Sequence, residues 1–212
     1  MIVVGVTGSF ASGKSETTRL LKSKGAHIFD ADVAARKALR KGEPAAEAVS
    51  KLFGKTVLKK NGDVDRKKLA ARVFRNPKEL KQLNILIHPG VIFECLGRIA
   101  HHRGQKGVLV LDVPLLFESK MDSLADIVVV VTSKRAASLK RAAQRRIPAA
   151  LALKILASQW PAAKKASRAD FVIENDGSLA DLKKKVSKLW LELVKLSTLK
   201  GVVRPRSPLK GE

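Results

Sequence analysis

The stretch Gly8-Ser9-Phe10-Ala11-Ser12-Gly13-Lys14-Ser15 fits the pattern G-x-x-x-x-G-K-[ST]. A short aliphatic run at residues 2–6 precedes it, and helical periodicity over residues 14–24 follows it. A loop between a strand and a helix turns several backbone N–H groups toward one point, where the helix N-terminus adds a positive field. The stretch therefore predicts a cradle for the phosphates of a nucleoside triphosphate.

The residues of this cradle have distinct predicted tasks. We expect Lys14 to reach the β- and γ-phosphates of ATP and the Ser15 hydroxyl to ligate Mg²⁺. The main chain is expected to hold the other phosphate oxygens. The predicted ATP-binding residues of this region are Gly8, Ala11, Ser12, Gly13, Lys14, Ser15 and Glu16.

Aliphatic runs alternate with helical patterns along the rest of the chain, which predicts an α/β fold with a three-layer parallel sheet. The expected strands are residues 2–6, 27–29, 108–113, 127–131 and 171–173. The expected helices of this core are residues 14–24, 33–40, 134–145, 149–159 and 179–196.

Residues 43–105 differ from this pattern, because they show helical periodicity without a convincing central strand. The helical stretches there are residues 66–74, 78–86 and 91–102. We therefore expect a nucleotide-binding core formed by residues 1–42 and 106–199, with a lid at about 144–165 and a helical insertion at 43–105. Residues 200–212 are rich in Pro, Gly and basic residues, which predicts a flexible basic tail.

The composition is that of an ordinary globular protein, with 45% hydrophobic and 29% charged residues. No apolar run reaches the roughly 20 residues that cross a bilayer, and the N-terminus lacks the order of a secretory signal. The single cysteine, Cys95, cannot form an intramolecular disulfide. These features predict a cytoplasmic protein that has no membrane partner.

The net charge of +23, from 42 Lys and Arg against 19 Asp and Glu, has three interpretations. It can attract small polyanions, contact DNA or RNA, or reflect a lysine-rich solvated surface. Aromatic residues, which stack on single-stranded nucleic acid, make up only 4% of the chain. A nucleic-acid partner is therefore not expected, although charge alone does not decide among the three.

An ordered set of segments resembles the dephospho-CoA kinase family over nearly the whole chain. The segments are Val6-Thr7-Gly8, Phe29-Asp30-Ala31-Asp32, Leu83-Asn84-Ile85-Leu86-Ile87-His88-Pro89, Leu111-Asp112-Val113-Pro114-Leu115-Leu116-Phe117-Glu118, Gln159 and Ala169-Asp170-Phe171-Val172-Ile173-Glu174-Asn175. The resemblance implies a P-loop kinase core, similar to nucleoside-monophosphate kinases, with a helical CoA-binding insertion and a helical lid. It also implies transfer of a phosphoryl group from ATP to the ribose 3′-hydroxyl of dephospho-CoA.

By this resemblance, Asp32 is the carboxylate that binds the acceptor and takes the proton of its 3′-hydroxyl. Asp32 follows the second predicted strand, so it is expected at the carboxyl edge of the sheet, where ligands bind. The alternative is that Asp32 only caps the following helix, since Asp is a favoured capping residue. Asp30 is the expected structural partner of Asp32.

Four further residues are candidates near the metal or the substrate. Asp112 ends a predicted strand, where a carboxylate near Mg²⁺ and a purely structural residue are equally plausible. The resemblance implies that His88 lies by the dephospho-CoA pocket. Leu115 and Glu118, after Pro114, are candidates for positioning that substrate.

Arg141 and Arg145 are four residues apart, which predicts that both project from one helix face as a catalytic clamp on the triphosphate. The alternative for this lysine- and arginine-rich helix is a solvated basic face. Asn175 resembles a position that contacts the adenine of ATP, although an Asn-Asp-Gly turn explains it nearly as well.

The loop departs from the family pattern where Ser9 and Ala11 stand in place of common glycines, and where Glu16 replaces a usual threonine. We expect φ at Ala11 to stay in a region accessible to alanine. Glu16 brings a negative charge toward the α-phosphate, so weaker ATP affinity is one expected consequence.

The sequence therefore predicts an ATP-dependent, Mg²⁺-requiring dephospho-CoA kinase that takes small-molecule substrates. The alternatives are another P-loop kinase acting on a nucleoside or nucleotide, or a basic nucleic-acid-binding ATPase whose binding falls steeply with salt. The order of the Asp32, His88 and Pro114 segments argues against the first alternative.

Overall fold

The computed structural model describes residues 1–199, so the predicted tail at residues 200–212 lies outside the described residues. The chain divides into two compact units. One comprises Met1–Phe29 and the chain from Ile99 onward, and the other comprises Asp30–Arg98. We refer to them as the nucleotide unit and the helical unit.

A five-stranded sheet organises the nucleotide unit, with strand order β2-β3-β1-β4-β5. Its central strand β1 pairs in parallel with β3 on one side and with β4 on the other, and β4 pairs in parallel with β5. The strands are β1 Ile2–Gly8, β2 His27–Asp30, β3 Val108–Asp112, β4 Ile127–Thr132 and β5 Phe171–Glu174. The predicted parallel α/β sheet is thus confirmed.

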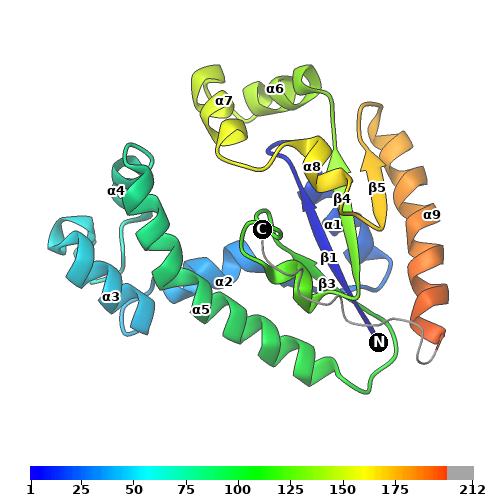
Figure 1. The fold of residues 1–212 in the computed structure, drawn as a ribbon, viewed down its shortest axis with the longest axis horizontal. Helices are drawn as coiled ribbons and strands as arrows, with labels where there is room; N and C mark the ends of the chain where they lie inside the picture. Colours follow the sequence, from blue (N-terminus) through cyan, green and yellow to red (C-terminus); the bar gives the residue numbers. More distant parts are fainter. Residues whose placement is uncertain (200–212) are drawn as a thin grey trace. The chain divides into compact units, whose positions relative to one another are not determined.

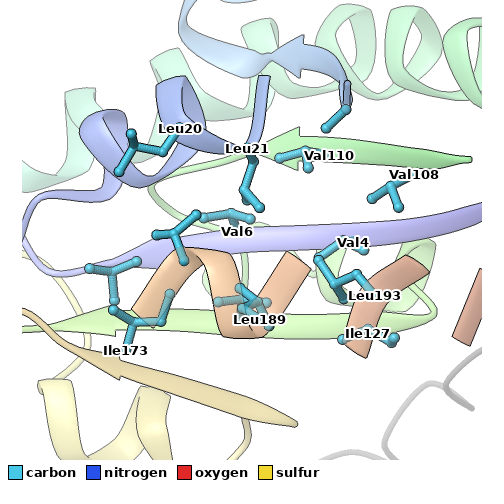
Figure 2. Packing of buried hydrophobic residues seen from close by; sticks show 14 of the residues in the cluster. Val4, Val6, Leu20, Leu21, Val108, Val110, Ile127, Ile173, Leu189 and Leu193 are labelled. Atoms are coloured by element: carbon cyan, nitrogen blue, oxygen red, sulfur yellow. The ribbon is translucent and has the colours of Figure 1, made fainter. Parts of the chain in front are cut away.

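Both faces of the sheet are buried, which explains why the central strands are nearly continuous runs of Val, Leu and Ile. Alternate residues of β1, including Val4 and Val6, pack against helices α1 (Lys14–Ser23) and α9 (Leu179–Thr198). Figure 2 shows Leu21 of α1 and Leu189 of α9 among these strand side chains. On the other face, the segment Met121–Leu124 (η2) packs against β1, and α8 (Ala162–Ala166) packs against β4.

The part of the chain between β4 and β5, which includes the region predicted as a lid, is helical, as expected for residues 134–145 and 149–159. It forms α6 (Arg135–Gln144), α7 (Ala149–Ala157) and α8. Figure 1 shows α6 and α7 next to each other beyond the end of β4, where they lie outside the layers of the sheet. The short helix α8 was not predicted, because its five residues are too few to show a helical period.

The helical unit has a core of its own. Buried side chains of its helices, including Val49, Phe53 and Leu69, form one hydrophobic cluster. The unit contains α2 (Ala31–Ala38), α3 (Pro44–Phe53), η1 (Lys55–Val57), α4 (Arg66–Val73) and most of α5 (Pro77–His102). Cys95 of α5 is fully buried, and burial raises the pKa of its thiol to about 12.

The helical stretches expected at residues 78–86 and 91–102 are both helical, and they form one helix, because α5 runs without a break from Pro77 to His102 and carries Pro89 in its interior. Proline removes one backbone donor from a helix, which usually ends or kinks it. The continuous α5 is also long and apolar enough to span a membrane by length and composition alone. A single such helix is weak evidence for a membrane span, because a core helix passes the same test.

Gly5 in the middle of β1 provides a test of the packing on the face of the sheet that η2 and α8 cover. A Cβ at Gly5 would lie 2.8 Å from Leu116 Cδ2 and 3.2 Å from Ala125 Cβ. We expect Gly5→Ala to lower the free energy of unfolding by about 2 kcal/mol through overpacking. Gly97→Ala on α5 is the matched control, since a Cβ there meets nothing within 4 Å. It should stabilise the protein by about 1 kcal/mol in the same urea titration, and equal effects of the two variants would contradict the packing described here.

Candidate active site

The predicted phosphate cradle is a tight loop between β1 and α1. Gly8 ends β1, and Gly13 caps α1 in the left-handed conformation with φ 102°. The amide of Ser12 donates to the carbonyl of Ser9 at 3.1 Å, which closes the turn. A Cβ at Gly8 would lie 2.4 Å from the carbonyl oxygen of Val131, so only glycine fits there. Because the loop follows the last residue of β1, it lies at the carboxyl edge of the sheet, where ligands of parallel α/β folds bind.

The prediction for the backbone at Ala11 is wrong, because its φ is +56°. This is the left-handed region, which costs a residue with a Cβ about 1–2 kcal/mol. A left-handed residue in such a loop helps successive N–H groups to point into one concavity, so the geometry of an anion-binding nest supplies the reason. The methyl group of Ala11 is buried against Ala142 of α6 and Ala152 of α7.

Lys14, at the start of α1, forms an ion pair with Asp112 at the end of β3. The pair is largely buried, with side chains 13% and 8% exposed. The strand register explains why the two side chains lie close together, because Asp112 is aligned with Val6 in the neighbouring strand β1, two residues before the loop. The structure therefore brings together two of the residues predicted from the sequence.

Arg141 and Asn175 bind the outer side of the loop through its carbonyl groups. The Arg141 guanidinium donates to the carbonyl of Ala11 at 3.4 Å and to the carbonyl of Asn175 at 2.6 Å. The Asn175 side chain is buried and donates through Nδ2 to the carbonyl of Ser12 at 2.8 Å. Residues from α6 and from the end of β5 thus satisfy acceptors that the turned loop cannot pair internally.

Three other predicted residues of the nucleotide unit lie on the surface or near it. Ser15 is exposed in the first turn of α1. Glu16 accepts two hydrogen bonds from Arg19 at 2.6 and 2.9 Å, and this pairing holds the pKa of its carboxyl below the ordinary value. Arg145 is the C-cap of α6 and is exposed. Arg141 and Arg145 therefore have different surroundings, although the spacing predicted equivalent roles.

The segment after β3 holds Leu115 and Glu118, which were predicted to position the substrate. Leu115 is partly exposed in a turn, where its carbonyl accepts from the amide of Ser119 at 2.8 Å. Glu118 Oε1 accepts from the ammonium of Lys165 at 2.9 Å and from the backbone amide of Trp160 at 2.9 Å. The contacts described for Glu118 are thus to the protein itself.

Asp32 and His88 belong to the helical unit. Asp30 is the N-cap of α2, because its side chain accepts from the amide of Val33 at 2.9 Å. The expectation that Asp30 has the structural role is confirmed, and Asp32 lies in the first helical turn as an exposed residue. His88, on α5, is half-buried, and burial lowers the pKa of its imidazole below the ordinary value.

Sequence reasoning missed the roles of Gln159 and Lys165. Gln159 Oε1 accepts from the amide of Phe10 in the loop at 3.0 Å, and Lys165 is completely buried. Gln159 was recognised as part of the family resemblance but was given no task. Lys165 gave no signal, because it lies in a stretch from residue 133 to residue 169 that contains many Lys and Arg and no acidic residue.

These features define a P-loop nucleotide-binding enzyme. They are the loop, the lysine at the start of the helix, the carboxylate at the end of the neighbouring strand, and the order of the strands. Comparison with known proteins gives the family. Residues 2–181 match the family model described as dephospho-CoA kinase. A dephospho-CoA kinase from Fusobacterium nucleatum subsp. nucleatum is 41% identical over 189 residues, which cover 89% of this chain and 96% of that protein.

Solved structures agree with this result. The dephospho-CoA kinase from Campylobacter jejuni has a TM-score of 0.70 and 31% identity, and the match covers 92% of this chain and 98% of that one. The shikimate kinase from Acinetobacter baumannii, at 13% identity and a TM-score of 0.54 over 94% of this chain and 96% of that one, shares the fold alone. The chain belongs to the dephospho-CoA kinase family.

The left-handed conformation of Ala11 can be tested with Ala11→Gly. Glycine removes the strain but also loses a buried methyl group and gains freedom in the unfolded chain, so we expect a change near zero in the free energy of unfolding. The control is Ala71→Gly at an exposed position of α4, which should cost about 1 kcal/mol. If thermal unfolding shows that Ala11→Gly loses as much as the control, the strain does not exist in solution.

Proposed function

We propose that this member of the dephospho-CoA kinase family transfers the γ-phosphoryl group of ATP to the ribose 3′-hydroxyl of dephospho-CoA and releases ADP and CoA. In this proposal the loop from Gly8 to Ser15 holds the triphosphate, and Lys14 contacts the β- and γ-phosphates. One observation carries this proposal: the Lys14 ammonium lies at the carboxyl edge of the sheet, at the start of α1, and is held there by Asp112. Phosphates at this position meet both the helix N-terminus and a fixed positive charge.

Asp32 is proposed to accept the proton of the 3′-hydroxyl. Its neighbour Asp30 already caps α2, so the capping alternative for Asp32 loses its support. A carboxylate is a weak base, but in a loose phosphoryl-transfer transition state the hydroxyl loses its proton late. Orientation of the hydroxyl toward the γ-phosphorus then matters more than base strength.

Mg²⁺ is proposed to accompany ATP. The Ser15 hydroxyl and the Asp112 carboxylate are hard oxygen donors, which suits this ion, and both flank the loop. No cluster of three or more His, Cys, Asp or Glu side chains that could hold a metal lies within residues 1–199. The ion would therefore share its coordination with phosphate oxygens and water, and it would neutralise charge on the β- and γ-phosphates.

The two arginines are proposed to divide the work of the clamp. Arg141 holds the loop through the carbonyl of Ala11 and also bonds to the carbonyl of Asn175 after β5, whereas the exposed guanidinium of Arg145 suits direct contact with the transferring phosphoryl group. Asn175 is proposed to act on the nucleotide mainly through its bond to the loop at Ser12, in addition to the predicted adenine contact.

The helical unit is proposed to bind dephospho-CoA, with His88 at the substrate pocket. The lowered pKa of His88 keeps the imidazole neutral at pH 7, so it would recognise the substrate as a hydrogen-bonding group rather than as a cation. Leu115 is proposed to contact the same substrate. We further propose that the enzyme works in the cytoplasm, without a membrane or nucleic-acid partner.

A coupled assay of ADP release tests the substrate directly. Dephospho-CoA, nucleosides and nucleic acid are supplied in parallel with ATP, with and without a chelator of Mg²⁺. We expect turnover with dephospho-CoA alone and its loss on chelation. ADP release that depends on nucleic acid instead would favour the ATPase alternative.

Asp32→Asn tests the proposed base. We expect kcat to fall about 100-fold or more, with the dissociation constant of ATP unchanged, since general-base groups typically contribute 10²–10⁴. Asp30→Asn is the matched control, because asparagine caps a helix as well as aspartate does. Full turnover by Asp32→Asn would remove Asp32 from the mechanism.

The division between the arginines gives a separate test. Arg141→Ala should lower the free energy of unfolding by about 1–3 kcal/mol, because the loop carbonyl of Ala11 and the carbonyl of Asn175 after β5 both lose their donor. Arg145→Ala should leave stability within about 0.5 kcal/mol but lower kcat about 100-fold. Lys140→Ala, at an exposed position of α6, controls for loss of a surface charge. An unchanged kcat in Arg145→Ala would argue against the clamp.

A further inference from the structure

Two consecutive residues after α7, Gln159 and Trp160, form hydrogen bonds with two different segments of the chain. Gln159 Oε1 accepts from the backbone amide of Phe10, inside the phosphate loop, at 3.0 Å. The backbone amide of Trp160 donates to Glu118 Oε1, on the segment after β3, at 2.9 Å. The C-terminal end of the lid region is thus joined to both segments that border the site.

The Glu118 side of this connection is built from buried charges. The ammonium of Lys165 is completely buried and bonds to Glu118 Oε1 at 2.9 Å and to the carbonyl of Pro114 at 3.1 Å. The Trp160 ring stacks on Phe117 with a centroid distance of 5.8 Å and an interplanar angle of 3°. The Lys164 ammonium lies over the Trp160 ring, 4.2 Å from the ring centroid. Trp160 is therefore held by its backbone and by both of these ring contacts.

The loop side of the connection is also fixed at more than one point. The Phe10 side chain packs against the buried cluster formed by Ala11, Ala142 of α6 and Ala152 of α7. Its amide would otherwise be an unpaired donor in a partly buried loop, because the neighbouring turn is closed by Ser12 rather than by Phe10. The hydrogen bond that the Phe10 amide donates to Gln159 Oε1 thus fixes the backbone at Phe10, which precedes the left-handed residue Ala11.

We infer that Gln159 is a positioning residue for ATP, and that Glu118 and Lys165 serve it by fixing the backbone at Trp160. This inference rests on the proposal that the loop holds the triphosphate. It gives Glu118 a task in addition to the substrate contact expected from the sequence, since Glu118 Oε1 accepts two donors within the protein, whereas the buried Oε2 has no hydrogen-bond partner among the described residues. The buried charge of Lys165 needs Glu118 as its partner, because an unpaired ammonium in the interior is strongly destabilising.

The first experiment compares Gln159→Met with Gln82→Met, a control at an exposed position of α5. Methionine has a similar length but offers the Phe10 amide no strong acceptor. We expect the KM for ATP to rise about fivefold, as for the loss of one neutral hydrogen bond, while the KM for dephospho-CoA stays within about twofold. An unchanged KM for ATP would overturn the inference.

The second experiment uses two double variants that both remove the buried charges. Glu118→Gln with Lys165→Met keeps an oxygen acceptor for the Trp160 amide, and Glu118→Leu with Lys165→Met removes it. We expect only the leucine pair to raise the KM for ATP, by about fivefold. A rise in the KM for dephospho-CoA in both pairs would assign Glu118 to the substrate instead. Circular dichroism of both pairs shows whether they fold, and if the leucine pair does not, Gln159→Met decides.

Lys14→Met separates failure of this inference from failure of the phosphate site on which it rests. Its ATP dissociation constant, measured by calorimetry, should rise well above that of the wild type. If Lys14→Met binds ATP as tightly as the wild type, the proposed phosphate site fails. If Lys14→Met weakens binding and Gln159→Met does not, only the role of Gln159 is overturned.

Discussion

A loop that points its N–H groups inward must find donors for the carbonyl groups that it turns outward, and this constraint organises the nucleotide unit. The carbonyls of Ala11 and Ser12 are satisfied by Arg141 and Asn175, which come from α6 and from the residue after β5. Those side chains reach the loop because β4 lies next to β1 and β5 next to β4. The strand order therefore brings the donors that the carbonyl groups of the phosphate loop require.

Much of this arrangement could be predicted, because it follows from short-range patterns. The aliphatic runs located all five strands, and the loop motif located the ion pair partner Lys14. The prediction for Ala11 failed because local preference favours negative φ for alanine, whereas the anion-binding shape of the loop overrides that preference. The continuity of α5 through Pro89 was not predicted for a related reason, since packing can maintain a helix through a residue that locally disfavours it.

The candidate site was less predictable than the fold, because side-chain partners depend on contacts distant in sequence. Gln159 and Phe10 are separated by 149 positions, and Glu118 and Trp160 by 42. Nothing near Lys165 distinguishes it from the exposed basic residues around it. Glu16 illustrates the opposite case, because a residue that departs from the family pattern is accommodated locally by Arg19, one helical turn away. The pairing places a positive charge beside the carboxylate of Glu16.

The burial of Cys95 has a consequence for an enzyme whose product carries a free sulfhydryl. The chain has one cysteine, its side chain is inaccessible, and burial raises its pKa to about 12, so almost no thiolate forms at neutral pH. Thiol–disulfide exchange requires a thiolate that can reach its target. The folded enzyme can therefore release coenzyme A, or meet its oxidised forms, without forming a mixed disulfide with its own product.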